Sequence, residues 1–398
     1  MRFDALADLN PKLQIRKGER APFVEMAALP QNGRDIADVS SRLFKGSGSK
    51  FQNGDTLIAK ITPCLENGKG ALVSGLQEGV TAFGSTEFIV ARAKQQSDQS
   101  FVYYLTRSES FREVAVSRME GTSGRQRVAW QQIASIEVPE FSLQERKQIG
   151  DILGALDDKI LLNSKMVATL ENLAEAKFKS WFLDFDPVHA RSQGLKPSHM
   201  DDATAALFPD RFGDDGLPES WGMQRLGELL KLNYGKALTK DLREPGNFPV
   251  YGSGGTSSTH VKALVAHPTV VVGRKGTVGT VFWAPHGCWP IDTTYYVTTE
   301  WPMVYAFRAL QHLPLSDMNT DAAVPGLNRE NAYRLEVPFP GEKIIEAYAE
   351  IAGAIQNKID SNEAENKTLA TLRDALLPRL MSGELRVGEA REMAEGVV

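Results

Sequence analysis

The sequence contains an internal repeat, and this repeat constrains the architecture more than any other feature. When residues 136–181 are placed over 335–380, an offset of 199 residues, 13 of the 46 aligned positions are identical without a gap. The identities include polar residues, such as Lys159 and its equivalent Lys358, that a generic amphipathic helix would not require. We therefore interpret the chain as a duplication of a globular part followed by a long helix.

The repeated segments have the pattern of two coiled-coil helices. Ser142 and Glu145 form a capping-box pattern that predicts the start of the first helix. From there apolar residues recur at alternating spacings of four and three, as in a coiled-coil seam. Asn163 and Asn362 occupy matching seam positions near the middle of the two helices. Equivalent residues of an antiparallel pair meet only at its centre, so we predict that these amides hydrogen-bond to each other and fix the register. The alternative is a solvent-exposed polar break in each helix.

The regions outside the helices contain short strand-like runs separated by Gly, Pro, Asn and Ser. We therefore predict an α+β fold, with two strand-rich mixed α/β domains and two long helices that form an antiparallel coiled coil with a pseudo-twofold repeat. One segment between them has eight acidic against three basic residues over positions 184–219, which is typical of a solvated connector. The predicted order is a first domain at 1–141, a first spacer helix at 142–183, an acidic connector at 184–220, a second domain at 221–340, a second spacer helix at 341–381 and a polar tail at 382–398.

Charge and cysteine content narrow the classes of protein that remain. The formal net charge is −5, so a general cationic coat for nucleic acid is excluded and any such binding must rest on local patches. The two cysteines, Cys64 and Cys288, rule out a disulfide framework and favour a reducing compartment. The sequence shows neither an apolar signal core nor a run long enough to span a membrane. We therefore expect a soluble cytoplasmic protein.

Motifs for common chemistries are missing from the sequence. It has no phosphate-binding loop, no Asn-Pro-Pro-aromatic motif for amino methylation, and no glycine-rich dinucleotide fingerprint. The pair His286 and Cys288 lacks the further ligands that a zinc site would need. We therefore expect no catalytic residue, no metal site and no cofactor on this chain.

Local clusters of positive charge suggest where a polyanion could bind. Residues 41–75 hold five basic and two acidic side chains, and residues 223–280 hold eight and three. Several of these cations lie between glycines, where backbone amides can approach phosphate oxygens, although solvated loop charge is an equally simple reading. The candidate DNA-binding residues are Lys45, Lys50, Lys60, Asn67, Lys69, Arg125 and Arg127 in the first domain, and Tyr251, Ser253, Arg274, Lys275, Asn328 and Arg329 in the second.

Several longer motifs resemble the specificity subunits of type I restriction–modification systems, and the resemblance covers essentially the whole chain. One class of target-recognition domain is matched by residues 57–69 and 84–88, and another by residues 249–253, 273–276 and 290–296. Residues 181–187 and 377–384 resemble the ends of the family's two spacer helices. The start of the chain departs from the repeat, because residues 1–20 lack the tryptophan-containing segment that begins at Trp221.

The resemblance implies a non-catalytic DNA-recognition subunit in which each domain reads one half of a bipartite site in double-stranded DNA. The expected partners are two methyltransferase subunits, which modify adenine, and translocase–nuclease restriction subunits. S-adenosylmethionine, ATP and Mg²⁺ would then be bound by those partners. Two alternatives are a freestanding sequence-specific DNA-binding regulator and, less favoured by the missing motifs, an enzyme with its own active site. We expect exposed aromatic residues near the end of the first helix to bind a partner, namely Phe178, Trp181 and Phe182.

Overall fold

Two long helices dominate the computed structural model, which describes residues 1–122, 124–318 and 326–396. They are α4 (Leu143–Phe182) and α10 (Glu342–Ser382). The predicted capping box starts α4: the Glu145 amide donates to Ser142 Oγ, and the Ser142 amide donates to Glu145 Oε2. Proline removes one helix hydrogen-bond donor, but α10 continues through Pro378 to Ser382.

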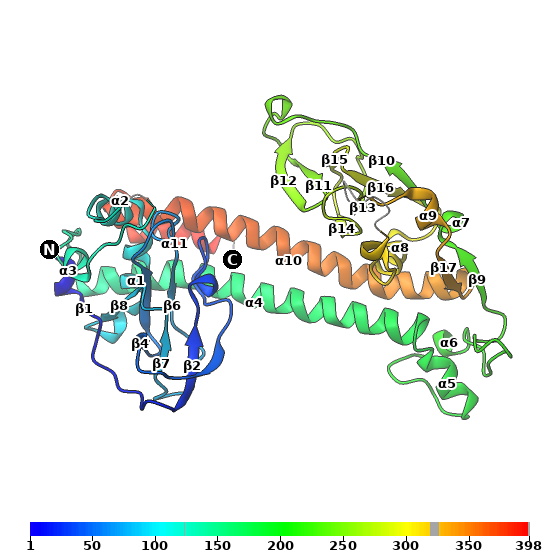
Figure 1. Ribbon diagram of the computed structural model, residues 1–398, viewed down its shortest axis with the longest axis horizontal. Coiled ribbons are helices and arrows are strands. Elements are labelled where there is room, and N and C mark those ends of the chain that lie inside the picture. Colours follow the sequence, from blue (N-terminus) through cyan, green and yellow to red (C-terminus); the bar gives the residue numbers. More distant parts are fainter. Residues whose placement is uncertain (123, 319–325, 397–398) are drawn as a thin grey trace. The chain divides into compact units, whose positions relative to one another are not determined.

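The chain divides into two units, and each helix passes from one unit into the other (Figure 1). The first unit comprises Met1–Lys165 and Glu363–Val398, and the second comprises Met166–Asn362. In the first unit Asp157 contacts Arg373, and Lys159 contacts Glu365. A higher residue number on α4 thus meets a lower residue number on α10. The helices therefore run antiparallel, as the repeat predicts.

Two four-stranded sheets form the globular part of the first unit. In one sheet every neighbouring pair is antiparallel, whereas the other contains one parallel pair, β2 with β7. The first has the order β1 (Ala7–Leu9), β8 (Phe88–Ala93), β5 (Asp55–Ala59) and β6 (Gly70–Leu72); the second has the order β3 (Ser40–Leu43), β2 (Arg20–Val24), β7 (Ala82–Gly84) and β4 (Ser49–Phe51). The helices of this part are α1 (Gln99–Arg107), α2 (Glu109–Ser117) and α3 (Trp130–Ala134).

The second unit repeats this topology. Its first sheet is again antiparallel throughout, and its second again contains one parallel pair, β11 with β15. The first has the order β10 (Lys231–Tyr234), β16 (Thr294–Thr298), β13 (Thr269–Gly273) and β14 (Val281–Ala284); the second has the order β12 (Gly255–His260), β11 (Phe248–Gly252) and β15 (Trp289–Pro290). A short ladder joins β9 (Gly222–Arg225) to β17 (Glu336–Phe339), and the helices of this part are α7 (Leu226–Leu229), α8 (Met303–Gln311) and α9 (Arg329–Tyr333).

The repeat extends to the amino end of the chain, where the sequence alone was ambiguous. Arg2 pairs with Glu137, just as Arg225 pairs with Glu336 in the second unit. Glu137 and Glu336 are 199 residues apart, which is the offset of the helical repeat. The backbone partners therefore match Arg2 to Arg225 of the second copy.

The acidic connector folds, contrary to the expectation of a solvated segment. It contains α5 (Asp186–Ser192) and α6 (Asp202–Ala205), and its Val188 and Phe208 side chains are buried. Both pack in a cluster with Trp181, Trp221 and Tyr348 of the same unit. The charged residues occupy the outer positions of this segment, and a few apolar side chains are enough to attach it to the core.

The carboxyl-terminal segment is also structured, which corrects the expectation of a polar tail at 382–398. It forms α11 (Val387–Glu395), and its Leu385 and Ala390 side chains are buried in the core of the first unit. That core also contains Phe3, Tyr104 and Leu153, so both chain ends contribute to the same packed region. Among the described residues, no helix is both long enough and apolar enough to cross a membrane.

Candidate nucleic-acid interface

Arg274 lies directly after β13 and is held by backbone hydrogen bonds on both sides. Its N–H donates to the Thr293 carbonyl at 2.9 Å, and its own carbonyl accepts from the Leu327 N–H at 2.8 Å. The guanidinium donates to the Asp292 carbonyl from both Nη2, at 2.6 Å, and Nε, at 3.1 Å. A neutral carbonyl orients the guanidinium without neutralising it, so its positive charge remains available to an anion.

An exposed tyrosine lies between Arg274 and a second arginine. Tyr234 ends β10 and is 53% exposed. The Cζ atoms of Arg274 and Arg329 lie 5.2 and 5.3 Å from the centre of its ring. Both distances are within the range of cation–π interactions, so the ring holds two cations beside one aromatic surface. Sequence reasoning missed Tyr234, because no periodicity distinguishes it from an ordinary strand residue.

These side chains border a hollow of about 290 Å³ in the second unit. Burial raises the pKa of Tyr295, which lies in its wall, to about 12, so this hydroxyl stays protonated at neutral pH. Four residues selected from the sequence therefore meet at one place although they come from two distant segments. The lining consists of Tyr234, Arg274, Lys275, Tyr295, Gly326, Leu327, Asn328, Arg329 and Glu330.

Asn328, a candidate DNA-binding residue, has its side-chain oxygen engaged within its own domain. Its side-chain oxygen caps α9 by accepting hydrogen bonds from the Glu330 N–H at 2.8 Å and the Asn331 N–H at 3.3 Å. Bidentate reading of adenine needs an acceptor and a donor together, and the acceptor is already used. Asn328 therefore positions the first residue of α9, Arg329, at the edge of the hollow.

Tyr251 also needs correction as a candidate DNA contact. Tyr251 is 8% exposed, and its hydroxyl donates inward to the Trp283 carbonyl at 3.2 Å. The Ser253 carbonyl accepts from the Thr280 hydroxyl at 2.6 Å, which ties two loops together. The glycines around both residues made them resemble a flexible polar loop in the sequence, but packing against distant segments buries Tyr251. Ser253 is half-buried and remains a candidate contact.

Lys60 and Arg127 come together in the first unit. The Lys60 carbonyl accepts from the Val128 N–H at 2.9 Å, which brings the chain beyond Arg127 to the end of β5. Arg127 makes a two-pronged ion pair with Glu87, with distances of 2.9 and 3.0 Å, and Lys60 Nζ lies 4.0 Å from the same carboxylate. The hydrogen bonds to Glu87 raise the pKa of Arg127. Two cations share one anion here, so the cluster keeps one net positive charge.

The other candidates of the first unit do not join this cluster. Lys69 is half-buried and donates to the Met26 carbonyl at 3.1 Å, which points its ammonium into its own domain. Lys50 lies on β4, with its Nζ 5.1 Å from the Phe44 ring centre. Lys45, Asn67 and Arg125 are exposed. They remain candidates for contacts with a polyanion, but as separate surface groups.

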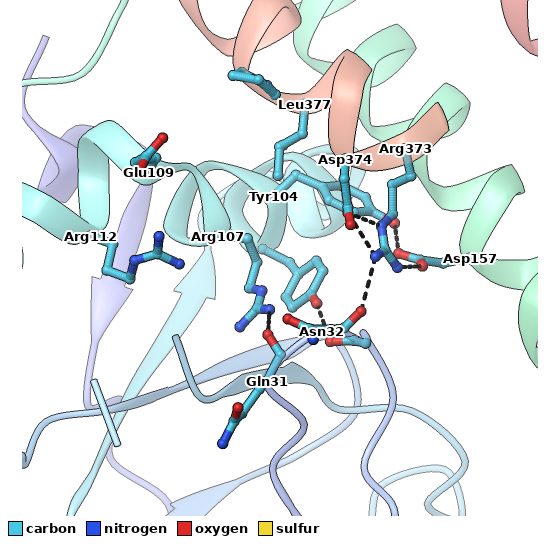
Figure 2. A pocket seen from close by; sticks show the side chains of 13 residues that line it. Gln31, Asn32, Tyr104, Arg107, Glu109, Arg112, Asp157, Arg373, Asp374 and Leu377 are labelled. Atoms are coloured by element: carbon cyan, nitrogen blue, oxygen red, sulfur yellow. Dashed lines mark hydrogen bonds and ion pairs between the residues drawn. The ribbon is translucent and has the colours of Figure 1, made fainter. Parts of the chain in front are cut away.

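A buried polar network fixes the first domain to the helices (Figure 2). The Tyr104 hydroxyl of α1 donates to Asp157 Oδ2 of α4 at 2.5 Å, and Arg373 of α10 donates to Asp157 Oδ1 at 2.5 Å. Arg373 also donates to the Asn32 carbonyl at 2.9 Å. Arg34 adds a 2.7 Å ion pair with Asp158. Because these groups lie on three different elements, they orient the first recognition surface relative to the helices that pack against it.

Comparisons with known proteins agree with this duplicated layout. Residues 218–371 match the sequence model of the type I restriction modification DNA specificity domain. The HindI specificity subunit of Haemophilus influenzae is 26% identical over 84% of this chain and 87% of its own length. The chain is therefore similar to type I restriction specificity subunits over most of its length.

Two further similar proteins extend the comparison. The MjaIX specificity subunit of Methanocaldococcus jannaschii is 24% identical over 73% of this chain and 69% of its own length. The crystal structure of a type I S subunit from M. genitalium has a TM-score of 0.59 at 17% identity, over 96% of this chain and 95% of that one. This structural likeness supports the fold. Among the described residues, no group of three or more His, Cys, Asp or Glu side chains could hold a metal ion.

The aromatic residues of the first helix that were expected to be exposed and to bind a partner are core residues. Phe178, Trp181 and Phe182 are only 2–3% exposed. Within the second unit they pack on Tyr348 of α10, with ring centres 5.1–5.9 Å apart. The prediction of a partner surface was wrong, because a single helix viewed alone cannot show that the connector and α8 cover this end.

The hydrogen bond predicted between the two seam asparagines is also wrong. Asn163 is buried and donates instead to Glu365 Oε2 at 2.9 Å, and Lys159 Nζ lies 3.2 Å from Oε1 of the same carboxylate. The Asn362 side chain is 1% exposed, and neither of its polar atoms has a hydrogen-bond partner among the described residues. Both asparagines are buried, as a seam position requires, but they do not pair as amides.

Proposed function

We propose that the chain is the non-catalytic DNA-recognition subunit of a type I restriction–modification complex, and that each domain reads one half of a bipartite site. The observation that carries this proposal is the equivalence of Lys60 and Arg274. Each follows a central strand of its first sheet, β5 or β13. The Lys60 N–H donates to the carbonyl of Glu87, just before β8, and the Arg274 N–H donates to that of Thr293, just before β16. The Lys60 carbonyl accepts from the Val128 N–H and the Arg274 carbonyl from the Leu327 N–H, and these two donors are 199 residues apart. Two copies of one fold thus present a cation at the same place.

The chemistry of these positions suits the major groove of DNA. Arg274 can donate two parallel hydrogen bonds to the O6 and N7 atoms of guanine, whereas Lys60 offers a point charge to a base or a phosphate. Lys275 and Arg329 border the same hollow as Arg274 and can contact the flanking phosphates. A formal net charge of −5 on the whole chain makes such local cation clusters the main source of attraction.

Methylation and cleavage are assigned to partner subunits in this proposal. Two methyltransferase subunits would bind S-adenosylmethionine and modify an adenine in each half-site, after turning it out of the duplex. Restriction subunits would use ATP and Mg²⁺. The role of this chain is to select the sequence and to place the partners on it.

An exposed apolar row on α4 is the surface that fits a methyltransferase subunit. Leu162, Met166 and Leu173 are 57, 39 and 49% exposed, and their spacing places them on one face of the helix. This row replaces the buried aromatic residues as our candidate for partner binding. Leu162→Glu should abolish copurification with the methyltransferase subunit and leave the thermal unfolding of the isolated chain unchanged. Normal copurification of that variant would remove the row from the proposal.

The proposed function is tested by methylation mapping. The chain is produced with the methyltransferase subunit of its own system, and adenine methylation is sequenced across a genome. We expect one bipartite motif, with Arg274→Ala relaxing selection in one half and Lys60→Ala in the other. Lys147→Ala, which removes an exposed ion pair with Asp151 at the start of α4, is the control and should leave the motif unchanged. Methylation by the isolated chain, or relaxation of the same half by both variants, would contradict the proposal.

A further inference from the structure

The two globular domains contain equivalent backbone hydrogen bonds around Lys60 and Arg274. The Val128 N–H donates to the Lys60 carbonyl at 2.9 Å, and the Leu327 N–H donates to the Arg274 carbonyl at 2.8 Å. The next pair along is also repeated: Ile61 bridges to Arg127, and Lys275 bridges to Gly326. Residues 127 and 326 are 199 residues apart, and so are residues 128 and 327. The 199-residue offset of the two long helices therefore also relates these hydrogen-bonded residues of the two domains.

This register identifies the counterpart of Arg329 in the first domain. Arg329 is the first residue of α9, and Trp130 is the first residue of α3. The two positions are also 199 residues apart. Trp130 thus corresponds to Arg329 in the repeat, and Lys60 corresponds to Arg274 by its backbone hydrogen bonds. The sequence alone does not suggest this match, because tryptophan and arginine share no pattern.

The exposure of Trp130 supports a role outside folding. Its side chain is 43% exposed, whereas Ile133 and Ala134 of the same short helix are buried. The core side of α3 is thus supplied by those two residues, and much of the indole surface stays in water. Exposing so large an apolar ring costs free energy that contact with a ligand would recover.

We propose that Trp130 is a specificity-determining residue that contacts the methyl group of a thymine in the first half-site. This inference rests on the proposed function. An indole has one N–H donor and no acceptor, so it cannot make the bidentate contact that arginine makes with guanine. Its apolar face suits the thymine methyl group, which lies in the major groove. The two domains therefore use one backbone position for different bases, with an arginine in one copy and a tryptophan in the other.

The binding test uses the complete methyltransferase complex and duplexes that carry the mapped motif. Each thymine of the first half-site is replaced in turn by uracil, which removes only the methyl group. At one position we expect wild-type affinity to fall about fourfold, as for loss of one buried methyl contact. Trp130→Ala should bind the thymine duplex about tenfold more weakly and should not distinguish thymine from uracil there. Equal discrimination by wild type and variant at every position would overturn the inference.

Fluorescence gives a second readout that does not depend on activity. Trp130 is the only tryptophan of the first unit, since the other five lie between residues 181 and 301. Subtracting the emission spectrum of Trp130→Phe from that of the wild type therefore gives the emission of Trp130. DNA with an intact first half-site should change that difference, and scrambling the first half-site, but not the second, should abolish the change. An unaltered difference spectrum on binding cognate DNA would count against the contact.

Two further variants separate the possible failures. Leu143→Ala removes another exposed apolar side chain of the first unit, 49% exposed, and should leave DNA binding unchanged. Arg274→Ala reports on the second half-site alone. If Arg274→Ala weakens selection while Trp130→Ala has no effect, the thymine contact fails and the proposed function stands. If neither variant changes DNA binding, the proposed function fails as well.

Discussion

Asp157 and Arg373 form a buried ion pair between the two long helices of the first unit, with 2.5 Å between Oδ1 and Nη1. The repeat-equivalent position of Asp157 in the second unit is Gln356. Gln356 donates to Asp360 at 2.9 Å, and Asp360 accepts from Trp283 Nε1 at 3.1 Å. At equivalent positions of the duplicated helices, each domain is therefore attached by different polar chemistry.

Asp157→Asn should destabilise the first unit strongly. The side chains of Asp157 and Arg373 are 4 and 8% exposed, so the variant removes one of the two carboxylates that pair with this buried cation and leaves only Asp374. It also leaves a single side-chain oxygen where Arg373 and Tyr104 each had their own acceptor. Loss of one partner of a buried pair costs about 3–5 kcal/mol, whereas an exposed pair contributes about 0–1 kcal/mol. Urea denaturation should show this difference between Asp157→Asn and the exposed control Asp151→Asn. A similar midpoint for both variants would contradict the structural role of the network.

Asn362→Leu should raise the free energy of unfolding. The amide is buried without a hydrogen-bond partner among the described residues, so its replacement removes a desolvation cost of about 1–3 kcal/mol. Asn163→Leu should instead lower stability or leave it unchanged, because Asn163 donates to Glu365. Thermal unfolding of the two single variants measures the contrast. Equal shifts in the same direction would show that the two asparagines have equivalent surroundings.

Trp181→Ala should unfold the second unit rather than block a partner selectively. Trp181 is 2% exposed and packs on Phe208 and Tyr348, with ring centres 5.1 and 5.9 Å away. Truncating a buried tryptophan costs about 3–5 kcal/mol. Trp181→Phe should retain most of the stability and should assemble normally with the methyltransferase subunit. Failure of a folded Trp181→Phe variant to assemble would restore this residue as a partner contact.

The two cysteines should differ in reactivity with a thiol reagent at pH 8. Cys64 is half-buried, whereas Cys288 is fully buried and burial raises the pKa of its thiol to about 12. Because the unfolded thiol ionises near pH 8.5, this group lowers stability as the pH rises from about 8.5 to about 12. Titration with Ellman's reagent should find one rapid thiol in the folded chain and two in denaturant. Two rapid thiols in the folded chain would contradict the burial of Cys288.

The helices and the duplication were determined by the sequence alone, because coiled-coil spacing and capping are local patterns. Ser142 and Glu145 lie three residues apart, and their hydrogen bonds form as the pattern predicts. Family motifs also identified Lys60 and Arg274, which the structure places at equivalent positions. The burial of Asn163 and Asn362 followed from the seam, but their hydrogen-bond partners did not, since the facing residues depend on how two separate helices pack.

Tertiary structure decided which side chains share a surface. Tyr234, Arg274 and Arg329 are separated by dozens of residues, and they meet only because β10, β13 and α9 are joined through backbone hydrogen bonds. The same long-range bonds identify Trp130 and Arg329 as corresponding positions of the two domains, although their side chains have nothing in common. Backbone pairing is nearly independent of side-chain identity, so the two domains keep one fold after their sequences have diverged. The sequence did not show that Trp181 and Tyr251 are buried, because no local pattern shows which distant segment covers a side chain.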